Sequence, residues 1–161
     1  MKTSGFATAA ALAFASLGLA SCGGAAEQPA AQAGNVIDGM TISEGRLILP
    51  AVAGNPGVVY FELAYDGDRQ VALNRAKVEG AQSAEFHQYG EWAGEMQMQA
   101  MQPLPLKKGD RVSFEPGGNH LMAMELSPEL QAGGTTEVTL TVSGGAKHTF
   151  AAQIQPPGED R

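Results

Sequence analysis

Residues 136–142 have the sequence TEVTLTV, and this stretch decides the fold class. Polar and aliphatic side chains alternate along it, so a strand places its three aliphatic side chains on one face. Gly144 and Gly145 follow and predict a tight hairpin between the strands Thr136–Ser143 and His148–Gln155. Two adjacent strands of this kind indicate a β-sheet with one buried face.

The rest of the chain from Met40 onward repeats this pattern of short runs separated by Gly, Pro, Asn and Asp. Further strands are predicted at Thr41–Leu49, Val58–Tyr65, Gln70–Val78, Ser83–Gln88, Glu95–Met101, Arg111–Phe114 and His120–Leu126. A turn-rich loop is expected over Gln88–Gly94, and no stretch has helical period beyond a single turn at Ser127–Gln131. The pattern predicts one all-β domain over residues 40–155, a sandwich or small barrel, followed by a polar tail at 156–161.

Composition narrows the class of protein. The chain has 161 residues and a formal net charge of −7, without the basic patch that nucleic-acid binding needs. Its single Cys excludes an internal disulfide and a cysteine-cluster zinc site. The sequence contains no Gly-rich phosphate loop, His-Glu-x-x-His motif or nucleophile elbow, so we do not expect an enzyme.

The N-terminal residues have the features of a targeting signal. An apolar run of about 15 residues, Phe6–Ala20, follows Lys2 and is shorter than the roughly 20 residues of a membrane span. Residues 19–22, LASC, resemble the bacterial lipobox. We therefore expect a lipoprotein signal peptide over residues 1–21 and lipidation of Cys22. The alternative is an ordinary signal peptide followed by a chance Cys.

Residues 22–39 comprise this Cys and a linker of small and polar residues. A flexible linker of this length spans roughly 20–25 Å. Several acyl chains on one residue give stable membrane anchoring. Gly23 follows the Cys, and by resemblance to enterobacterial lipoproteins the absence of Asp there favours the outer membrane. The expected location is the periplasm, with the domain anchored to a membrane by lipid.

Histidine and methionine residues gather on three of the predicted strands. In a strand, residues i and i+2 share a face at about 6–7 Å, so His120 and Met122 can bind one ion. If the strands on either side of Gln88–Gly94 pair as a hairpin, His87 and Met98 also come together.

Two imidazoles and two thioethers make a soft, neutral set of ligands. Thioether sulfur is a poor ligand for Mg, Ca or Mn but suits Cu(I), and imidazole accepts either oxidation state of copper. The set therefore favours a copper site, with Cu(I) as the expected ion and Cu(II) as the second choice. The alternative is structural, because methionines at strand period commonly fill a core.

The spacing His87-x10-Met98-x21-His120-x-Met122 resembles the motif of the periplasmic copper chaperone family PCu(A)C. The surroundings also match, namely EFH at residues 85–87 and VSFEPGGNHLM at residues 112–122, and the resemblance covers residues 42–154. Gln99 stands where relatives often carry Arg, and Asn119 where they often carry Tyr. Neither departure removes a ligand.

This resemblance implies a cupredoxin-like Greek-key β-sandwich that binds Cu(I) through His87, Met98, His120 and Met122. It implies that the turn Pro116–Gly118 places His120. The implied function is a chaperone that hands Cu(I) by ligand exchange to an acceptor protein. The acceptor would be the Cu(A) centre in subunit II of cytochrome c oxidase, or another copper-assembly factor.

Nearby residues give further candidates. Met96 and Met124 share strand faces with motif methionines and are candidate auxiliary ligands, whereas Met101 should face away into the core. Glu91 and Glu95 are candidate carboxylate ligands for Cu(II).

Trp92 and His148 lie outside the motif, and three functions other than a chaperone stay open. Trp92 is expected to act as a packing lid and His148 to be structural or solvent-exposed. The open alternatives are a copper buffer for tolerance, a structural lipoprotein whose methionines form core, and a cupredoxin electron carrier. The last would need a His2Cys set of ligands, and the only Cys lies at the lipobox.

Overall fold

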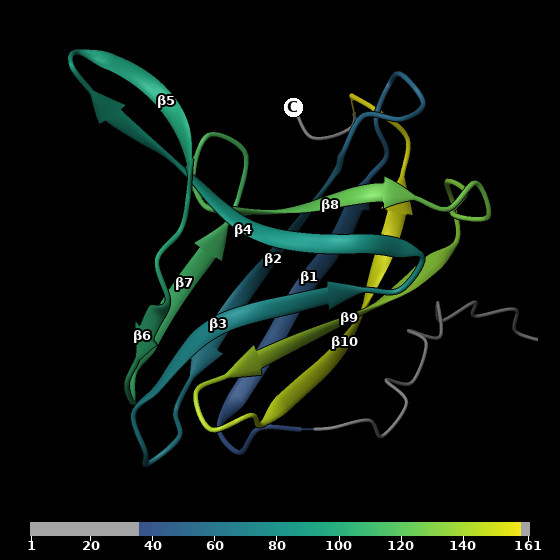
Figure 1. Cartoon of the computed structure of the whole chain (residues 1–161). Helices are drawn as coiled ribbons and strands as arrows, with labels where there is room; N and C mark the ends of the chain where they lie inside the picture. Colours follow the sequence, from purple (N-terminus) through teal and green to yellow (C-terminus); the bar gives the residue numbers. More distant parts are fainter. Residues whose placement is uncertain (1–35, 159–161) are drawn as a thin grey trace, which may run out of the picture. The chain divides into compact units, whose positions relative to one another are not determined.

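The computed structural model describes residues 36–158, with Trp92 by its backbone only, and all regular elements in this range are strands (Figure 1). They are β1 (Met40–Ile48), β2 (Gly57–Tyr65), β3 (Val71–Val78), β4 (Ala81–Trp92), β5 (Glu95–Ala100), β6 (Leu104–Leu106), β7 (Asp110–Phe114), β8 (His120–Leu126), β9 (Thr135–Val142) and β10 (Lys147–Gln155). The all-β prediction is confirmed. No helix long and apolar enough to cross a membrane occurs among the described residues. The predicted signal peptide (1–21), Cys22 and most of the linker lie outside them.

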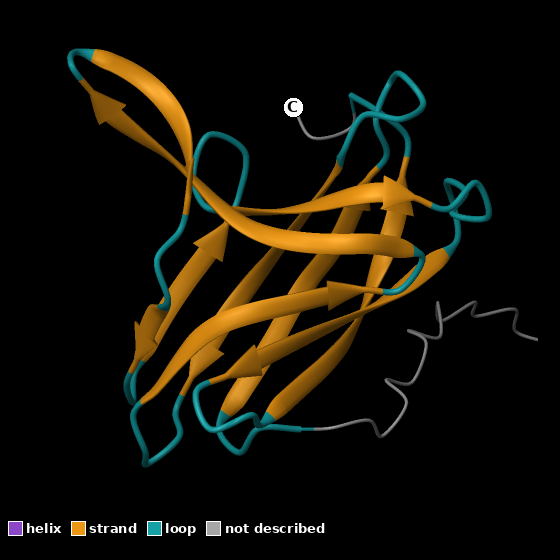
Figure 2. Cartoon of the chain, in the orientation of Figure 1, coloured by secondary structure: helices purple, strands orange, loops and turns teal. Residues whose placement is uncertain are grey.

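The strands are hydrogen-bonded in the order β5-β4-β8-β2-β1-β10-β9-β3-β6, and β7 pairs with β2 beside this path. β1 and β10 are parallel, whereas β8 pairs antiparallel with β2 and β4. The sheet folds over, so that β3, β4 and β8 lie across the interior from β1, β2 and β10 (Figure 2). Neighbours that are far apart in sequence, such as β2 and β8, are typical of Greek-key sandwiches.

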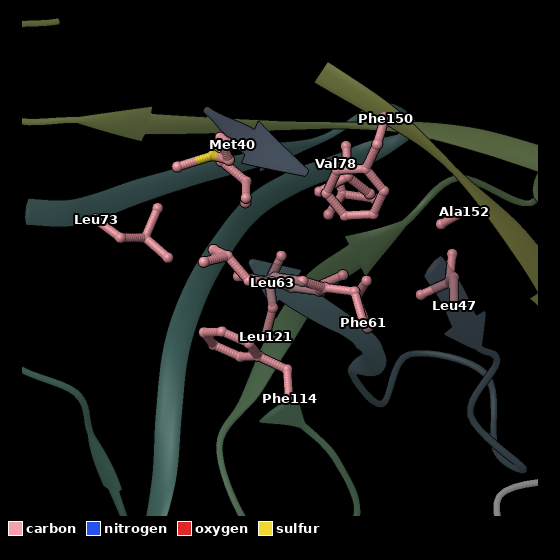
Figure 3. Close-up of a cluster of buried hydrophobic side chains, with 14 of the residues drawn as sticks. Met40, Leu47, Phe61, Leu63, Leu73, Val78, Phe114, Leu121, Phe150 and Ala152 are labelled. Atoms are coloured by element: carbon pink, nitrogen blue, oxygen red, sulfur yellow. The ribbon is translucent and has the colours of Figure 1, made fainter. Parts of the chain in front are cut away.

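Aromatic and aliphatic side chains from both layers fill the interior (Figure 3). Phe61 of β2 stacks on Phe114 of β7 with ring centroids 4.2 Å apart, and Phe150 of β10 lies 5.2 Å from Phe61. Leu121 of β8 is fully buried against the same cluster. Full burial of each such side chain stabilises the fold by about 1.5–3 kcal/mol, so this core holds the two layers together.

The hairpin predicted from the C-terminal strands is present. β9 and β10 pair antiparallel, and the Val142 N–H donates a hydrogen bond to the Ala146 carbonyl at 3.0 Å. Gly144 and Gly145 between them have φ values of 85° and 84°, a left-handed conformation that favours glycine. The alternation of buried and exposed residues along β9 agrees with the predicted strand.

Two local predictions are wrong. β4 continues through Trp92 and β5 begins at Glu95, so Gln88–Trp92 is strand rather than loop. Ala93 and Gly94 form the turn between β4 and β5 with φ values of 54° and 85°, the two positive values of a type I′ turn. The short strand β6 was not predicted, because its central Pro105 argues against a strand. It lies at the sheet edge, where proline is tolerated.

β8 separates the core from the face that carries the candidate ligands. Leu121 and Ala123 are fully buried in the core. Because side chains alternate along a strand, His120 and Met122 project from the opposite face of β8. The fold therefore holds these two side chains on a rigid strand, outside the hydrophobic core.

Candidate metal centre

Strands β4 and β8 bring two histidines together. His87 of β4 lies directly opposite His120 of β8 in the antiparallel register, with the ring centroids 6.0 Å apart. Directly opposite residues share one face of a sheet. His87 pairs with His120 on one side and with Ala100 of β5 on the other, so the pair lies at the base of the β4–β5 hairpin. This hairpin projects from the sandwich (Figure 1).

His120 has one ring nitrogen fixed by the backbone and the other aimed at a sulfur. Its side chain is buried, and Nδ1 lies 3.0 Å from the Gly118 carbonyl oxygen. A carbonyl only accepts, so in the neutral imidazole Nδ1 carries the proton and Nε2 keeps its lone pair. Nε2 lies 3.2 Å from Met98 Sδ. Two electron-pair donors thus face each other, which is the arrangement that a bound cation satisfies.

Met98 reaches this position because β5 folds back on β4. In the hairpin register Met98 lies opposite Tyr89, two residues beyond His87 on the same face. The side chain of Met98 remains 45% exposed although its sulfur contacts His120. One sulfur lone pair can therefore face the histidine while the other side of the residue faces solvent.

His87 has two ring nitrogens that are buried and lack a hydrogen-bond partner among the described residues. A buried polar atom without a partner costs about 1–3 kcal/mol. The Glu85 carboxylate lies 3.6 Å from Nε2, beyond hydrogen-bond distance. An unpaired nitrogen opposite His120 is chemically suited to bind a cation, because coordination supplies the missing partner.

Met122 shares the face of His120 at the next position along β8. It lies opposite Glu85 on β4 and Val58 on β2, and its side chain is partly buried. The structure thus places all four predicted ligands on one face of β5, β4 and β8. The direct contact among them joins His120 and Met98.

The other methionines differ sharply in exposure. Met96 lies opposite Glu91 on the hairpin and is 65% exposed, whereas Met124 lies opposite Ser83 and is partly buried. Met101 packs against the hydrophobic core, as predicted.

Two groups near His120 were not predicted as part of the site. The Tyr89 ring lies 5.4 Å from the His120 ring, centroid to centroid. Tyr89 is two residues from His87, so the same-face rule for strands could have found it. Gly118 fixes the orientation of the imidazole through its carbonyl. The resemblance implied that Gly118 belongs to the turn that places His120, but not that its carbonyl contacts the imidazole.

The predicted carboxylates and Trp92 lie along the hairpin. Glu95 is opposite Trp92 beside the turn, and both Glu91 and Glu95 are exposed. The carboxylate beside His87 is instead that of Glu85. Trp92 ends β4 rather than lying in a loop.

His148 is structural rather than solvent-exposed. It is buried in β10, and its Nδ1 accepts a hydrogen bond of 3.3 Å from the Ile37 N–H. Burial lowers the pKa of His148 below its usual value, because the charged form loses hydration. Ile37, which the sequence assigned to the linker, belongs to the core cluster.

The described residues contain no group of three or more His, Cys, Asp and Glu side chains that could hold a metal ion. The face that carries His87 and His120 also carries the thioethers of Met98 and Met122. Two imidazoles with thioethers suit a soft cation such as Cu(I) and do not suit Mg or Ca.

The sequence of this chain matches one family model. Residues 40–154 match the family model LpqE-like, described as "Putative lipoprotein LpqE-like". No curated protein sequence matches the chain.

Solved structures have a similar fold. The copper-bound PCuAC domain from PmoF2 is 22% identical, with 76% of this chain and 97% of that one covered and a TM-score of 0.62. The apo PCuAC domain from PmoF1 is 21% identical, with coverage of 75% and 97% and a TM-score of 0.61. CuI-DR1885 from Deinococcus radiodurans, a solution structure, is 23% identical, with coverage of 86% and 87% and a TM-score of 0.52. The cupredoxin-like PCuAC fold is the one expected from the motif.

Proposed function

The chain belongs to the LpqE-like family and has the PCuAC fold, and from this premise we propose that it is an extracytoplasmic copper chaperone. It binds Cu(I) as cargo and passes it to an acceptor protein. The copper-bound state of two similar structures, the PmoF2 domain and DR1885, supports copper as the cargo.

The proposed ligands are His87, Met98, His120 and Met122. The contact of 3.2 Å between His120 Nε2 and Met98 Sδ carries this assignment, because the Nδ1 contact with Gly118 leaves Nε2 its lone pair. Two ligands bound tetrahedrally to a first-row metal at roughly 2.0 and 2.3 Å would lie about 3.5 Å apart. The two atoms therefore need only a small movement to bind one ion.

The difference in burial between the ligands supports release by exchange. His120 is 4% exposed and Met98 is 45% exposed. An approaching acceptor reaches the Met98 side of the site first, so its thiolate or imidazole can bind Cu(I) there and replace the resident ligands one at a time. Copper then moves from protein to protein without being free in solution.

Membrane anchoring fits delivery to a membrane protein. The family is described as lipoproteins, which supports lipidation of Cys22 after removal of residues 1–21. Several acyl chains would anchor the domain at a membrane. We propose periplasmic delivery, with the Cu(A) centre of cytochrome c oxidase as the acceptor.

The exposure of the methionines weighs against a purely structural lipoprotein. Met96 and Met98 are 65% and 45% exposed, whereas a methionine that fills core is buried, as Met40 is. A copper buffer would use the same site, so a genetic test separates it from a chaperone. Deletion of a chaperone lowers cytochrome oxidase activity when copper is scarce, and added copper restores it. Deletion of a buffer leaves oxidase activity intact and raises sensitivity to copper, which would overturn the delivery role.

A further inference from the structure

Met96 is the most exposed methionine near the candidate centre. It lies on β5 two residues before Met98, so both side chains are on the same face of the hairpin, about 6–7 Å apart along the strand. The exposed fraction falls from 65% at Met96 to 45% at Met98 and 4% at His120. Two thioethers and one imidazole, which are soft or borderline ligands, therefore form a row from the solvent-exposed Met96 to the buried His120.

The charge distribution around this row favours a cation. Glu85 and Glu91 lie on the same face of β4 as His87, and the chain contains no Lys or Arg between Lys77 and Lys107. Glu91 lies directly opposite Met96 in the hairpin register. Surface charge of one sign raises the local concentration of the opposite ion and its rate of encounter. A thioether beside a carboxylate is thus placed where Cu(I) would first arrive.

Met124 also carries a thioether, but it lacks the exposure and the neighbouring carboxylate of Met96. It lies on the same sheet face, beyond Met122, but it is partly buried and opposite the uncharged Ser83. The two methionines flank the candidate centre on opposite sides, and only Met96 is largely exposed and paired with a carboxylate.

We infer that Met96 is an exchange ligand, which binds Cu(I) in transit between solvent or an acceptor and the resident site. This inference rests on the proposed function. During release a bond forms between Cu(I) and Met96 Sδ while the bond to His120 Nε2 breaks, and Met98 holds the ion throughout. Loading follows the reverse order. Copper remains Cu(I), and no electron or proton is transferred.

A transit ligand has a kinetic signature that a resident ligand lacks. A transit ligand stabilises the transition state of copper transfer and leaves the free energies of the apo and copper-bound protein unchanged. Its loss therefore lowers the loading and release rates by the same factor. The ratio of the two rates, which is the affinity, then stays constant. Removal of a resident ligand instead raises the release rate and weakens affinity.

The test compares the full chain, purified in detergent, with the variants Met96→Leu and Met124→Leu. Leucine keeps the apolar volume and removes the sulfur. Stopped-flow mixing with a colorimetric Cu(I) chelator under anaerobic conditions measures release, and mixing the apo protein with the Cu(I)–chelator complex measures loading. Equilibrium competition with the same chelator gives affinity, and circular dichroism checks folding.

We expect Met96→Leu to slow loading and release equally, by at least about threefold, with affinity within about twofold of the unmodified chain. Met124→Leu should match the unmodified chain in both rates. Unchanged rates in Met96→Leu would overturn the inference and leave the proposed function standing. Weakened affinity in Met96→Leu would make Met96 a resident ligand, which also overturns it. Absence of Cu(I) binding by the unmodified chain would instead defeat the proposed function itself.

Discussion

The Nε2 atom of His120 lies 3.2 Å from the Sδ atom of Met98, although their strands are not neighbours. β5 and β8 each pair with β4, which separates them by two strand spacings, or about 10 Å. Met98 therefore reaches across β4 beside Tyr89 to meet the imidazole. A flexible, polarisable side chain suits this reach, and the contact ties the projecting hairpin to the body of the domain.

Replacement of His120 should impair both binding and stability. His120→Ala removes a proposed ligand and a buried hydrogen bond to Gly118. We expect Cu(I) affinity to fall at least about tenfold and the free energy of unfolding to fall by about 1–2 kcal/mol. Chelator competition and urea denaturation measure the two effects. Retained affinity in a folded variant would remove His120 from the ligand set.

His148 provides the matched control for that experiment. His148→Gln replaces a buried imidazole that accepts a hydrogen bond from Ile37. It should cost stability while Cu(I) affinity stays unchanged, because His148 lies on β10, which is not paired with β4, β5 or β8. Loss of copper binding in this variant would indicate that general destabilisation, not ligand removal, explains the effect at His120.

His148 should also make stability depend on pH. Burial lowers its pKa in the folded state, so the unfolded chain binds the proton more tightly. Its contribution is complete above the unfolded pKa of roughly 6.5 and is lost as the pH falls below that value toward the lower folded pKa. Denaturant titrations at pH 7.5, 6.5 and 5.5, taken as approximate settings, should show a loss that is smaller in His148→Gln. Equal pH profiles for both proteins would refute this assignment.

A substitution in the turn of the β4–β5 hairpin should stabilise the domain. Ala93 has a φ of 54°, a conformation that Asn tolerates better than Ala. Ala93→Asn should raise the free energy of unfolding by about 0.5–1 kcal/mol, and Ala93→Val should lower it, since β-branched residues are strained there. Thermal unfolding of both variants checks this. A stabilising valine would argue against the type I′ turn.

Oxidation should distinguish the methionines. Peroxide converts thioethers to sulfoxides according to exposure, so Met96 and Met98 should react before Met40 and Met101. Loading with Ag(I), a soft ion that peroxide does not oxidise, should protect Met98 and leave Met96 reactive. Peptide mass spectrometry measures each site. Equal oxidation of Met98 with and without Ag(I) would count against its role as a soft-metal ligand.

Much of this arrangement was predictable because strand periodicity determines which side chains share a face. The strand His120–Leu126 was predicted with its observed bounds, and the common face of His120 and Met122 followed from it. A hairpin between His87 and Met98 was considered, but its arm Gln88–Trp92 was predicted as loop, because Ala-Gly is a weaker turn signal than Asn-Gly and Gly90 interrupts the pattern.

Other features depended on contacts that sequence alone does not reveal. The pairing of β4 with β8 joins segments far apart in sequence, so the opposition of His87 and His120 could not be read from periodicity. The burial of His120 does not follow from the strand pattern either. It lies on the face of β8 opposite the core, yet Met98, Tyr89 and His87 pack near it. These long-range contacts explain why its replacement should cost stability.

The most direct test is an anaerobic titration of Cu(I) into the full chain in competition with a colorimetric chelator, beside the double variant Met98→Leu/Met122→Leu. We predict one tightly bound equivalent of Cu(I), which the double variant loses while it keeps its fold by circular dichroism. No chelator-competitive binding by the folded chain, or undiminished binding by the folded double variant, would contradict the thioether site.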